Sequence, residues 1–128
     1  FLDLIRNKTN IKVNGSLKRF RDLIYIDDVV DALILTIKDN NNNNQIYNVG
    51  TGKKTTIKKL LQIISKVYNK ENLIKIKVSK STPGDMLGCY ADLTKIKKDL
   101  KFTPKVNLFK GLNRFKNWAE ENFYKNNL

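Results

Sequence analysis

The stretch of residues 21–38 reads RDLIYIDDVVDALILTIK. It opens with a short apolar, β-rich run, Leu23–Ile26, which predicts a strand buried on both faces. Apolar residues then recur with the period of a helix, at Val29, Val30, Leu33, Ile34 and Ile37. Asp27 or Asp28 is expected to cap that helix, where a carboxylate also suits the helix dipole. The stretch therefore predicts a buried strand that leads directly into an amphipathic helix.

The rest of the chain continues this alternation of strands and helices. Further strands are expected around Ile11 and Val13, over Ile46–Val49, and around Ile74, Ile76 and Val78. Helices are expected at residues 2–7, from about Thr55, over Leu93–Leu100 with Asp92 as its cap, and from about Asn107. Strands and helices that alternate in this way indicate an α/β protein.

The composition narrows the class of protein. The chain has 128 residues, a net charge of +13, no histidine and one cysteine. Its lysines are spread along the chain rather than packed into one stripe, so nucleic acid is not expected as a partner, although a basic field would steer a diphosphate ligand. Cys89 is expected to be a small buried side chain, and a lone cysteine without a disulfide partner suits the reducing cytoplasm. With no histidine and one cysteine, no metal site is expected. No apolar stretch is long enough to span a membrane.

A glycine turn, Gly50–Gly52, is followed by two lysines and resembles a phosphate loop. A Walker loop would need glycine at position 47, where this chain has Tyr47, and a dinucleotide fingerprint would need a third glycine where it has Thr55. The main interpretation is a tight turn that leads into a helix, with anion binding by the backbone N–H groups as the alternative.

Two further loops carry side chains suited to a nucleotide. Arg21 and Asp22 adjoin an expected buried strand, and Pro83-Gly84-Asp85 follows another strand. Open α/β sheets hold ligands at the ends of their strands. An arginine there can bind a phosphate through two parallel hydrogen bonds, and an aspartate can accept hydrogen bonds from ribose hydroxyls.

Four motifs occur together and in order. They are RDLIYIDD at residues 21–28, YNVGTG at residues 47–52, PGD at residues 83–85 followed by Ala91-Asp92, and Gly111 seven residues before Trp118. In this order and spacing they resemble the extended short-chain dehydrogenase/reductase family of sugar-nucleotide epimerases and dehydratases. The resemblance runs over roughly residues 11–120.

The resemblance implies a fold and a division of the enzyme. The fold class is α/β, the C-terminal portion of an NAD(P)-binding, Rossmann-like extended dehydrogenase/reductase with a small mixed α/β substrate-binding lobe. Residues 1–128 would form that substrate-binding portion, and the N-terminal half that binds NAD would be absent. The resemblance also implies a cytoplasmic enzyme and a homodimer.

The resemblance implies substrate-binding roles residue by residue. Arg21 would contact the diphosphate of a nucleoside-diphosphate sugar, and Asp85 would bind the ribose. Lys12 and Asn14 would offer backbone groups to the base. Thr82 stands where many members have a second phosphate-binding arginine, which leaves that contact in doubt.

The catalytic residues of the family have no counterpart in this sequence. The family uses a tyrosine followed four residues later by lysine, with NAD as the hydride carrier. No tyrosine in this chain has a lysine at that spacing. We therefore expect a catalytically incomplete part of an NAD-dependent epimerase that acts at the sugar 4-position. The alternatives are a 4,6-dehydratase fragment, a non-catalytic partner chain and a free-standing basic binding module.

Overall fold

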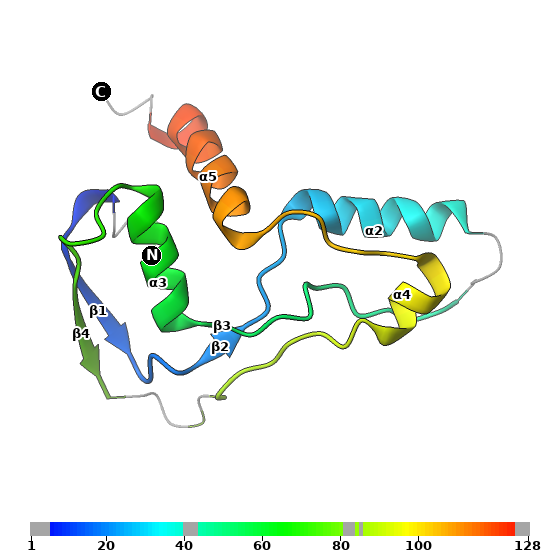
Figure 1. The fold of residues 1–128 in the computed structure, drawn as a ribbon, viewed down its shortest axis with the longest axis horizontal. Helices are drawn as coiled ribbons and strands as arrows, with labels where there is room; N and C mark the ends of the chain where they lie inside the picture. Colours follow the sequence, from blue (N-terminus) through cyan, green and yellow to red (C-terminus); the bar gives the residue numbers. More distant parts are fainter. Residues whose placement is uncertain (1–5, 40–43, 81–83, 85, 125–128) are drawn as a thin grey trace.

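The computed structural model describes residues 6–39, 44–80, 84 and 86–124. Within them the elements follow in the order β1 (Asn10–Asn14), β2 (Phe20–Arg21), α2 (Ile26–Lys38), β3 (Thr55–Thr56), α3 (Ile57–Val67), β4 (Lys75–Ser79), α4 (Thr94–Leu100), α5 (Leu108–Ala119) and the π-helix η1 (Glu120–Tyr124). Figure 1 shows β1, β4 and α3 gathered at one end of the molecule and α2 and α4 at the other. The short strands β2 and β3 lie between the two ends.

The first end has a sheet covered by one helix. β1 and β4 pair in parallel, with Val13 opposite Val78. Val13 and Ile11 alternate with exposed residues, and they are buried against Leu61 and Ile64 of α3. α3 begins where the Thr56 side chain accepts a hydrogen bond from the backbone N–H of Lys59 at 3.1 Å. This end therefore has its own apolar core.

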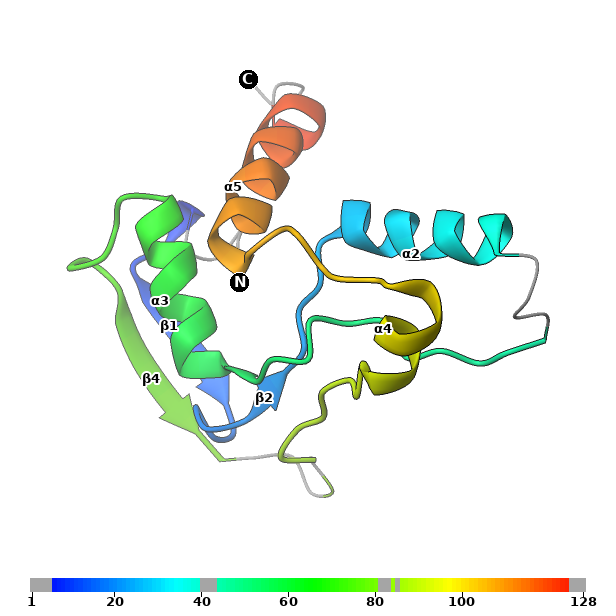
Figure 2. The same ribbon diagram turned by 45° about the vertical axis from the view of Figure 1, so that its right-hand side comes forward.

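A second core forms where α2 meets α4. It contains the buried side chains Ala32, Leu93, Ile96, Leu100 and Phe102. α4 ends at Lys101, which adopts a left-handed conformation with φ 55°, and the chain turns there so that Phe102 enters the core. Figure 2, turned by 45°, keeps α2 and α4 side by side and distant from β1 and β4.

β2, β3 and α5 connect the two ends. β2 pairs antiparallel with β3, and on its other side Phe20 bridges to Gly88 in parallel. α5 is capped by the Asn107 side chain and contacts α3. Gly111 of α5 lies so close to Tyr25 that a β-carbon there would sit 3.1 Å from the ring. These contacts fix the segment around β2 from several directions.

The structure confirms the predicted α/β class and most of the predicted elements. The helices expected from Thr55, over Leu93–Leu100 and from Asn107 form within two residues of those starts. The strands expected around Val13 and Ile76 form as β1 and β4. Of the helix expected at residues 2–7, only residues 6 and 7 are described, and both are helical.

Two predicted strands are wrong within the described residues. Ile26 is the first residue of α2, and the residues before it from position 22 have no regular structure. Residues 45–49 are also irregular, and Ile46 is 85% exposed. A strand requires a hydrogen-bonded neighbour, and neither segment has one in the part of the chain that the structure describes.

The apolar face predicted for α2 is exposed, and two further expectations about side chains are wrong. The outer side of α2 presents Val30, Leu33, Ile34 and Ile37 to solvent, while Ala32 faces the core. Neither Asp27 nor Asp28 caps α2, which begins after Tyr25 without a side-chain cap. Cys89 is exposed: it comes directly after Gly88, which bridges to Phe20, and it lies in a surface segment.

Candidate functional site

The glycine turn binds an anion that belongs to the chain itself. The Asp22 carboxylate accepts hydrogen bonds from the backbone N–H of Thr51 at 2.8 Å, of Gly52 at 2.9 Å and of Ala91 at 3.1 Å. The Thr51 hydroxyl donates to the same carboxylate. The N–H groups that sequence reasoning offered to a phosphate are therefore already occupied, and the turn interpretation holds.

Glycine is required at two positions of this turn for different reasons. A β-carbon on Gly50 would lie 2.5 Å from an Asp22 oxygen and 2.7 Å from the Ala91 β-carbon, so no side chain fits there. Gly52 has φ +70°, a left-handed conformation that favours glycine. The turn is thus shaped around the Asp22 carboxylate.

Burial and hydrogen bonding have opposite effects on the pKa of Asp22. Partial burial by itself would raise the pKa of its carboxyl group. The hydrogen bonds from Thr51, Ala91 and Gly52 outweigh that effect and lower the pKa below its usual value. Sequence reasoning offered Asp22 to ribose hydroxyls, and the structure assigns its acceptor capacity to the backbone instead.

Arg21 lies on β2 between two neighbouring segments. In the strand register it stands opposite Thr55 of β3. Its guanidinium donates to the Phe20 carbonyl at 2.8 Å and is half-buried. Among the described residues it forms no ion pair with a carboxylate. The guanidinium therefore retains N–H donors for a ligand.

A lysine that follows the glycine turn, Lys54, contacts the aromatic side of β2. Lys54 places its ammonium 5.2 Å from the centre of the Phe20 ring and 4.7 Å from that of Tyr90. Side chains alternate along a strand, so the Phe20 side of β2 is opposite to the Arg21 side. Lys54 therefore lies over aromatic rings, on the side of β2 opposite to that of Arg21.

Two of the other four predicted substrate-binding residues lie within the part of the chain that the structure describes. Lys12 and Asn14 are exposed on β1, and the Asn14 side chain accepts a hydrogen bond from the Ser79 hydroxyl at 2.7 Å. No contact among the described residues joins either of them to Arg21. Thr82 and Asp85 lie outside the described residues. The loop that carries them returns to the site at Leu87, whose carbonyl accepts from Phe20 N–H at 3.0 Å.

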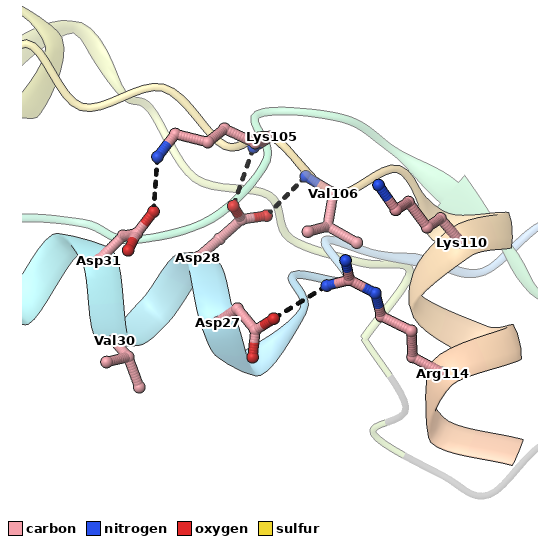
Figure 3. A pocket seen from close by; sticks show the side chains of 8 residues that line it. All are labelled: Asp27, Asp28, Val30, Asp31, Lys105, Val106, Lys110 and Arg114. Atoms are coloured by element: carbon pink, nitrogen blue, oxygen red, sulfur yellow. Dashed lines mark hydrogen bonds and ion pairs between the residues drawn. The ribbon is translucent and has the colours of Figure 1, made fainter. Parts of the chain in front are cut away.

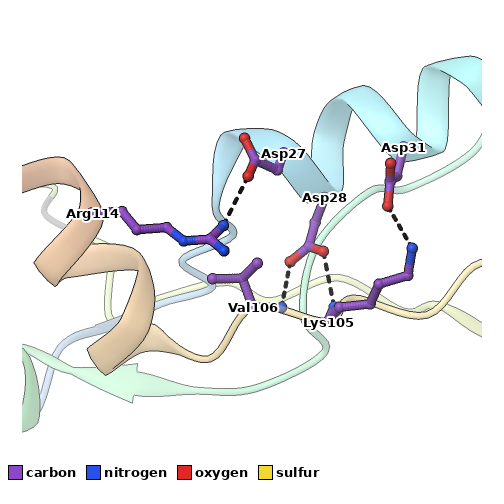
Figure 4. A network of polar contacts seen from close by, with 6 residues as sticks. All are labelled: Asp27, Asp28, Asp31, Lys105, Val106 and Arg114. Carbon is purple, nitrogen blue, oxygen red and sulfur yellow. Dashed lines mark hydrogen bonds and ion pairs between the residues drawn. The ribbon is translucent and has the colours of Figure 1, made fainter. Parts of the chain in front are cut away.

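A second polar cluster borders a hollow of about 550 Å³ beside the N-terminus of α2 (Figure 3). Buried Asp28 accepts from the backbone N–H groups of Lys105 and Val106, at 2.9 and 3.0 Å. Asp27 pairs with Arg114 at 2.9 Å, and Asp31 pairs with Lys105 at 2.7 Å (Figure 4). All three carboxylates have partners within the chain, so the cluster joins α2 to the segment that precedes α5 and, through Arg114, to α5 itself.

The described residues offer neither a metal site nor a membrane span. Among them, no group of three or more His, Cys, Asp or Glu side chains is arranged so that it could hold a metal ion. None of their helices combines the length and the apolar composition that crossing a bilayer requires.

Comparison with known proteins gives the family of the chain. The family model described as GDP-mannose 4,6 dehydratase matches residues 3–115. The chain therefore belongs to this family of NAD-dependent sugar-nucleotide epimerases and dehydratases, as the four motifs predicted.

Individual relatives place the chain among sugar-nucleotide enzymes. It is 30% identical over 123 residues to the UDP-glucuronate 4-epimerase of Thermodesulfobacterium geofontis, covering 95% of this chain and 37% of that protein. The UDP-glucose 4-epimerase of Thermotoga maritima, solved with UDP-glucose, matches with a TM-score of 0.81 and 27% identity, over 94% of this chain and 37% of that one.

A third relative was solved with a cofactor. The UDP-glucuronic acid 4-epimerase of Bacillus cereus, in complex with UDP-glucuronic acid and NAD, matches with a TM-score of 0.80 and 22% identity, over 94% of this chain and 38% of that one. At that identity the likeness concerns the fold. The chain spans between about a third and two-fifths of the length of these three relatives.

Sequence reasoning missed the residue that organises the site. The sequence suggested only that an aspartate at this position could accept hydrogen bonds from a ligand, whereas the Asp22 carboxylate binds the glycine turn and Ala91. The available signal was the spacing of glycines at positions 50 and 52, since a turn of that kind presents several N–H groups to one anion.

Proposed function

We propose that this chain forms the nucleotide-sugar-binding part of an NAD-dependent sugar-nucleotide epimerase that acts at the sugar 4-position. In this proposal Arg21 binds the diphosphate and Asp85 binds the ribose. Lys12 and Asn14 offer backbone groups to the base, and Thr82 occupies a phosphate-contact position without supplying a charge. We further propose that the enzyme is a cytoplasmic homodimer.

One observation carries the proposal. Arg21 is held in a short strand between β3 and the segment that returns from the P-G-D loop, and its guanidinium has no carboxylate partner among the described residues. A half-buried arginine in that position is suited to two parallel hydrogen bonds with a phosphate. The relatives solved with UDP-glucose and UDP-glucuronic acid support the same ligand class.

The residues of this chain do not fit the NAD-binding role. NAD supplies a hydride acceptor in such enzymes. Here the glycine turn that resembles a phosphate loop is occupied by Asp22, and the sequence has neither a dinucleotide fingerprint nor the tyrosine–lysine pair. We therefore assign to these residues only the binding and orientation of the nucleotide sugar, and to residues outside them the binding of NAD.

A 4,6-dehydratase is the second candidate, because the matching family model carries that description. The two activities give different products from one substrate. A 4-epimerase returns an isomer of unchanged mass, whereas a 4,6-dehydratase releases water and leaves a 4-keto-6-deoxy sugar.

The test is an assay of the full gene product that contains these residues. It is incubated with NAD and, in turn, with UDP-glucose, UDP-glucuronate and GDP-mannose, and the products are separated by mass and by sugar composition. We expect an epimer of unchanged mass from a UDP-sugar. Loss of water would favour the dehydratase, and no turnover of any sugar nucleotide would contradict both.

The 128-residue chain serves as the control in the same assay. We expect no turnover from it, with or without NAD. Turnover by the purified chain alone would contradict the assignment of catalysis to other residues.

A further inference from the structure

Three of the sequence motifs meet at Asp22. Its carboxylate receives four donors, namely the Thr51 N–H and hydroxyl, the Gly52 N–H and the Ala91 N–H. Thr51 and Gly52 belong to the glycine turn, and Ala91 lies beyond the P-G-D loop. Asp22 itself directly follows Arg21. A single side chain therefore joins the segment of Arg21 to two segments that are distant in the sequence.

The donors leave Asp22 with little capacity for a ligand. An ionised carboxylate has about four lone-pair sites, and all of them have donors here. Asp22 is thus unsuited to bind a substrate hydroxyl. Its effect on a ligand must pass through the residues that it holds.

The short strand that carries Arg21 is held on both edges. β3 pairs with it on one edge of β2, and Leu87 and Gly88 contact Phe20 on the other. The carboxylate of Asp22 anchors the chain immediately after it. Since an arginine binds a phosphate through a rigid fork of donors, a displacement of its backbone would misalign both hydrogen bonds.

We infer that Asp22 is a positioning residue for nucleotide-sugar binding, which holds Arg21 in register with the glycine turn and with the return of the P-G-D loop. This inference rests on the proposed function, because it assigns Asp22 to the same diphosphate site. It adds a residue that acts on the ligand only through Arg21.

The test is a double-mutant cycle in the full gene product. UDP, dTDP and GDP are titrated in turn by calorimetry, and the one that binds the native protein most tightly is the probe. Asp22→Asn keeps the shape of the side chain but replaces one acceptor oxygen with a donor. We expect it to weaken binding roughly tenfold in the native background, and by less than about twofold when Arg21 is already alanine.

Asp92→Asn is the matched control. Asp92 also accepts from a backbone N–H and a hydroxyl, both of Thr94, at 2.8 and 2.6 Å, but it has no described contact with the Arg21 segment. We expect this variant to bind the probe as the native protein does. A loss equal to that of Asp22→Asn would show a general response to the removal of an aspartate and would overturn the inference.

A second variant covers the case in which Asp22→Asn does not fold. Thr51→Val removes the hydroxyl, which donates to Asp22 and accepts from the exposed Lys53 N–H at 3.2 Å, and it leaves the three backbone donors to Asp22 in place. The variant is therefore expected to fold and to weaken binding less than Asp22→Asn, also only when Arg21 is present. In turnover assays both variants should raise KM for the nucleotide sugar and leave kcat nearly unchanged, the sign of lost uniform binding. A fall in kcat at unchanged KM would contradict a positioning role.

The cycle separates this inference from the proposed function. If Arg21→Ala binds the probe as tightly as the native protein, the diphosphate site is elsewhere and the proposed function loses its support. If Arg21→Ala weakens binding but Asp22→Asn has the same effect with and without Arg21, the site stands and only the positioning role is overturned.

Discussion

At the scale of single residues, aspartates at two motif positions accept hydrogen bonds from backbone N–H groups of distant segments. Asp22 accepts from Thr51, Gly52 and Ala91, and Asp28 accepts from Lys105 and Val106. An ionised carboxylate that accepts several backbone N–H groups forms strong hydrogen bonds and replaces a strand or helix partner that an irregular segment lacks. The motif aspartates thereby hold irregular segments in place.

Gly50→Ala should destabilise the chain by about 1–3 kcal/mol, the usual cost of overpacking. The new β-carbon would meet both Asp22 and Ala91, at 2.5 and 2.7 Å. Urea denaturation followed by circular dichroism measures the change. Asn48→Ala, at an exposed position two residues earlier, is the control and should change the free energy of unfolding by less than about 0.5 kcal/mol. Equal stability of the two variants would contradict the close fit at Gly50.

The pKa of Asp22 predicts a dependence of stability on pH. Its pKa is lower in the folded chain than in the unfolded one, so its contribution is present above the unfolded pKa and is lost as pH falls through the folded pKa. Thermal melts between about pH 6 and about pH 3 should therefore show a smaller loss of stability for Asp22→Asn than for the native chain. Parallel pH profiles would contradict the hydrogen bonding described for Asp22.

The sequence predicted which segments contribute to the candidate site, but it did not predict the contacts between them. The R-D and P-G-D motifs pointed to Arg21 and its loop, and the structure brings β2 beside Gly88 of that loop. That the glycine turn binds Asp22 depends on a contact across 29 positions, which local patterns do not encode. The role of Asp85 remains a prediction.

At the scale of elements, periodicity predicted helices well and strands less well. α3 formed where its apolar residues recur and where Thr56 caps it. A helix forms its hydrogen bonds within one segment, whereas a strand depends on a partner elsewhere. Leu23–Ile26 and Ile46–Val49 are apolar enough for strands, but within the described residues neither segment has a neighbour to pair with.

The hydrogen bonds that join Asp28 of α2 to the segment before α5 give a prediction, and the neighbouring Asp27 provides the comparison. Asp28 is 1% exposed, and Asp28→Ala would leave two backbone N–H groups without their acceptor (Figure 4). We expect a loss of about 2–5 kcal/mol in the free energy of unfolding. The neighbouring Asp27→Ala removes only an exposed ion pair and should cost about 0–1 kcal/mol.

Chemical denaturation of the two variants side by side checks this difference. Similar losses would show that Asp28 does not hold Lys105 and Val106 to α2. An Asp28→Ala chain as stable as the native one would contradict the structural role assigned to the Asp28 carboxylate.

At the scale of the whole molecule, net charge and exposed apolar surface have opposite effects on self-association. The chain carries a net charge of +13, yet no lysine or arginine occurs between Arg21 and Lys38. The outer side of α2 in that interval exposes Val30, Leu33, Ile34 and Ile37. A helix that is apolar on both sides is typical of a buried position.

This combination predicts association of the 128-residue chain as salt rises. Repulsion between chains is screened within about 8 Å at about 0.15 M salt, and the apolar surface then favours self-association. Sedimentation velocity across a salt series measures it. Leu33→Lys should reduce association more than Leu73→Lys, a control with the same 57% exposure outside α2. A monodisperse monomer with a sharp melt at physiological salt would contradict the expectation.

We propose that this chain binds the diphosphate of a nucleotide sugar through Arg21. The dissociation constant of a nucleoside diphosphate from the full gene product tests this proposal. The full gene product is titrated with the nucleoside diphosphate that it binds best, as the native protein and as Arg21→Ala, Lys53→Ala and Lys54→Ala. Loss of a charge-assisted hydrogen bond, about 1.5–3 kcal/mol, predicts binding roughly ten- to a hundredfold weaker for Arg21→Ala. The two lysine variants should lose less than about twofold, because Lys53 is exposed and Lys54 lies over the rings of Phe20 and Tyr90. Comparable losses at all three positions, or none at Arg21, would contradict the account.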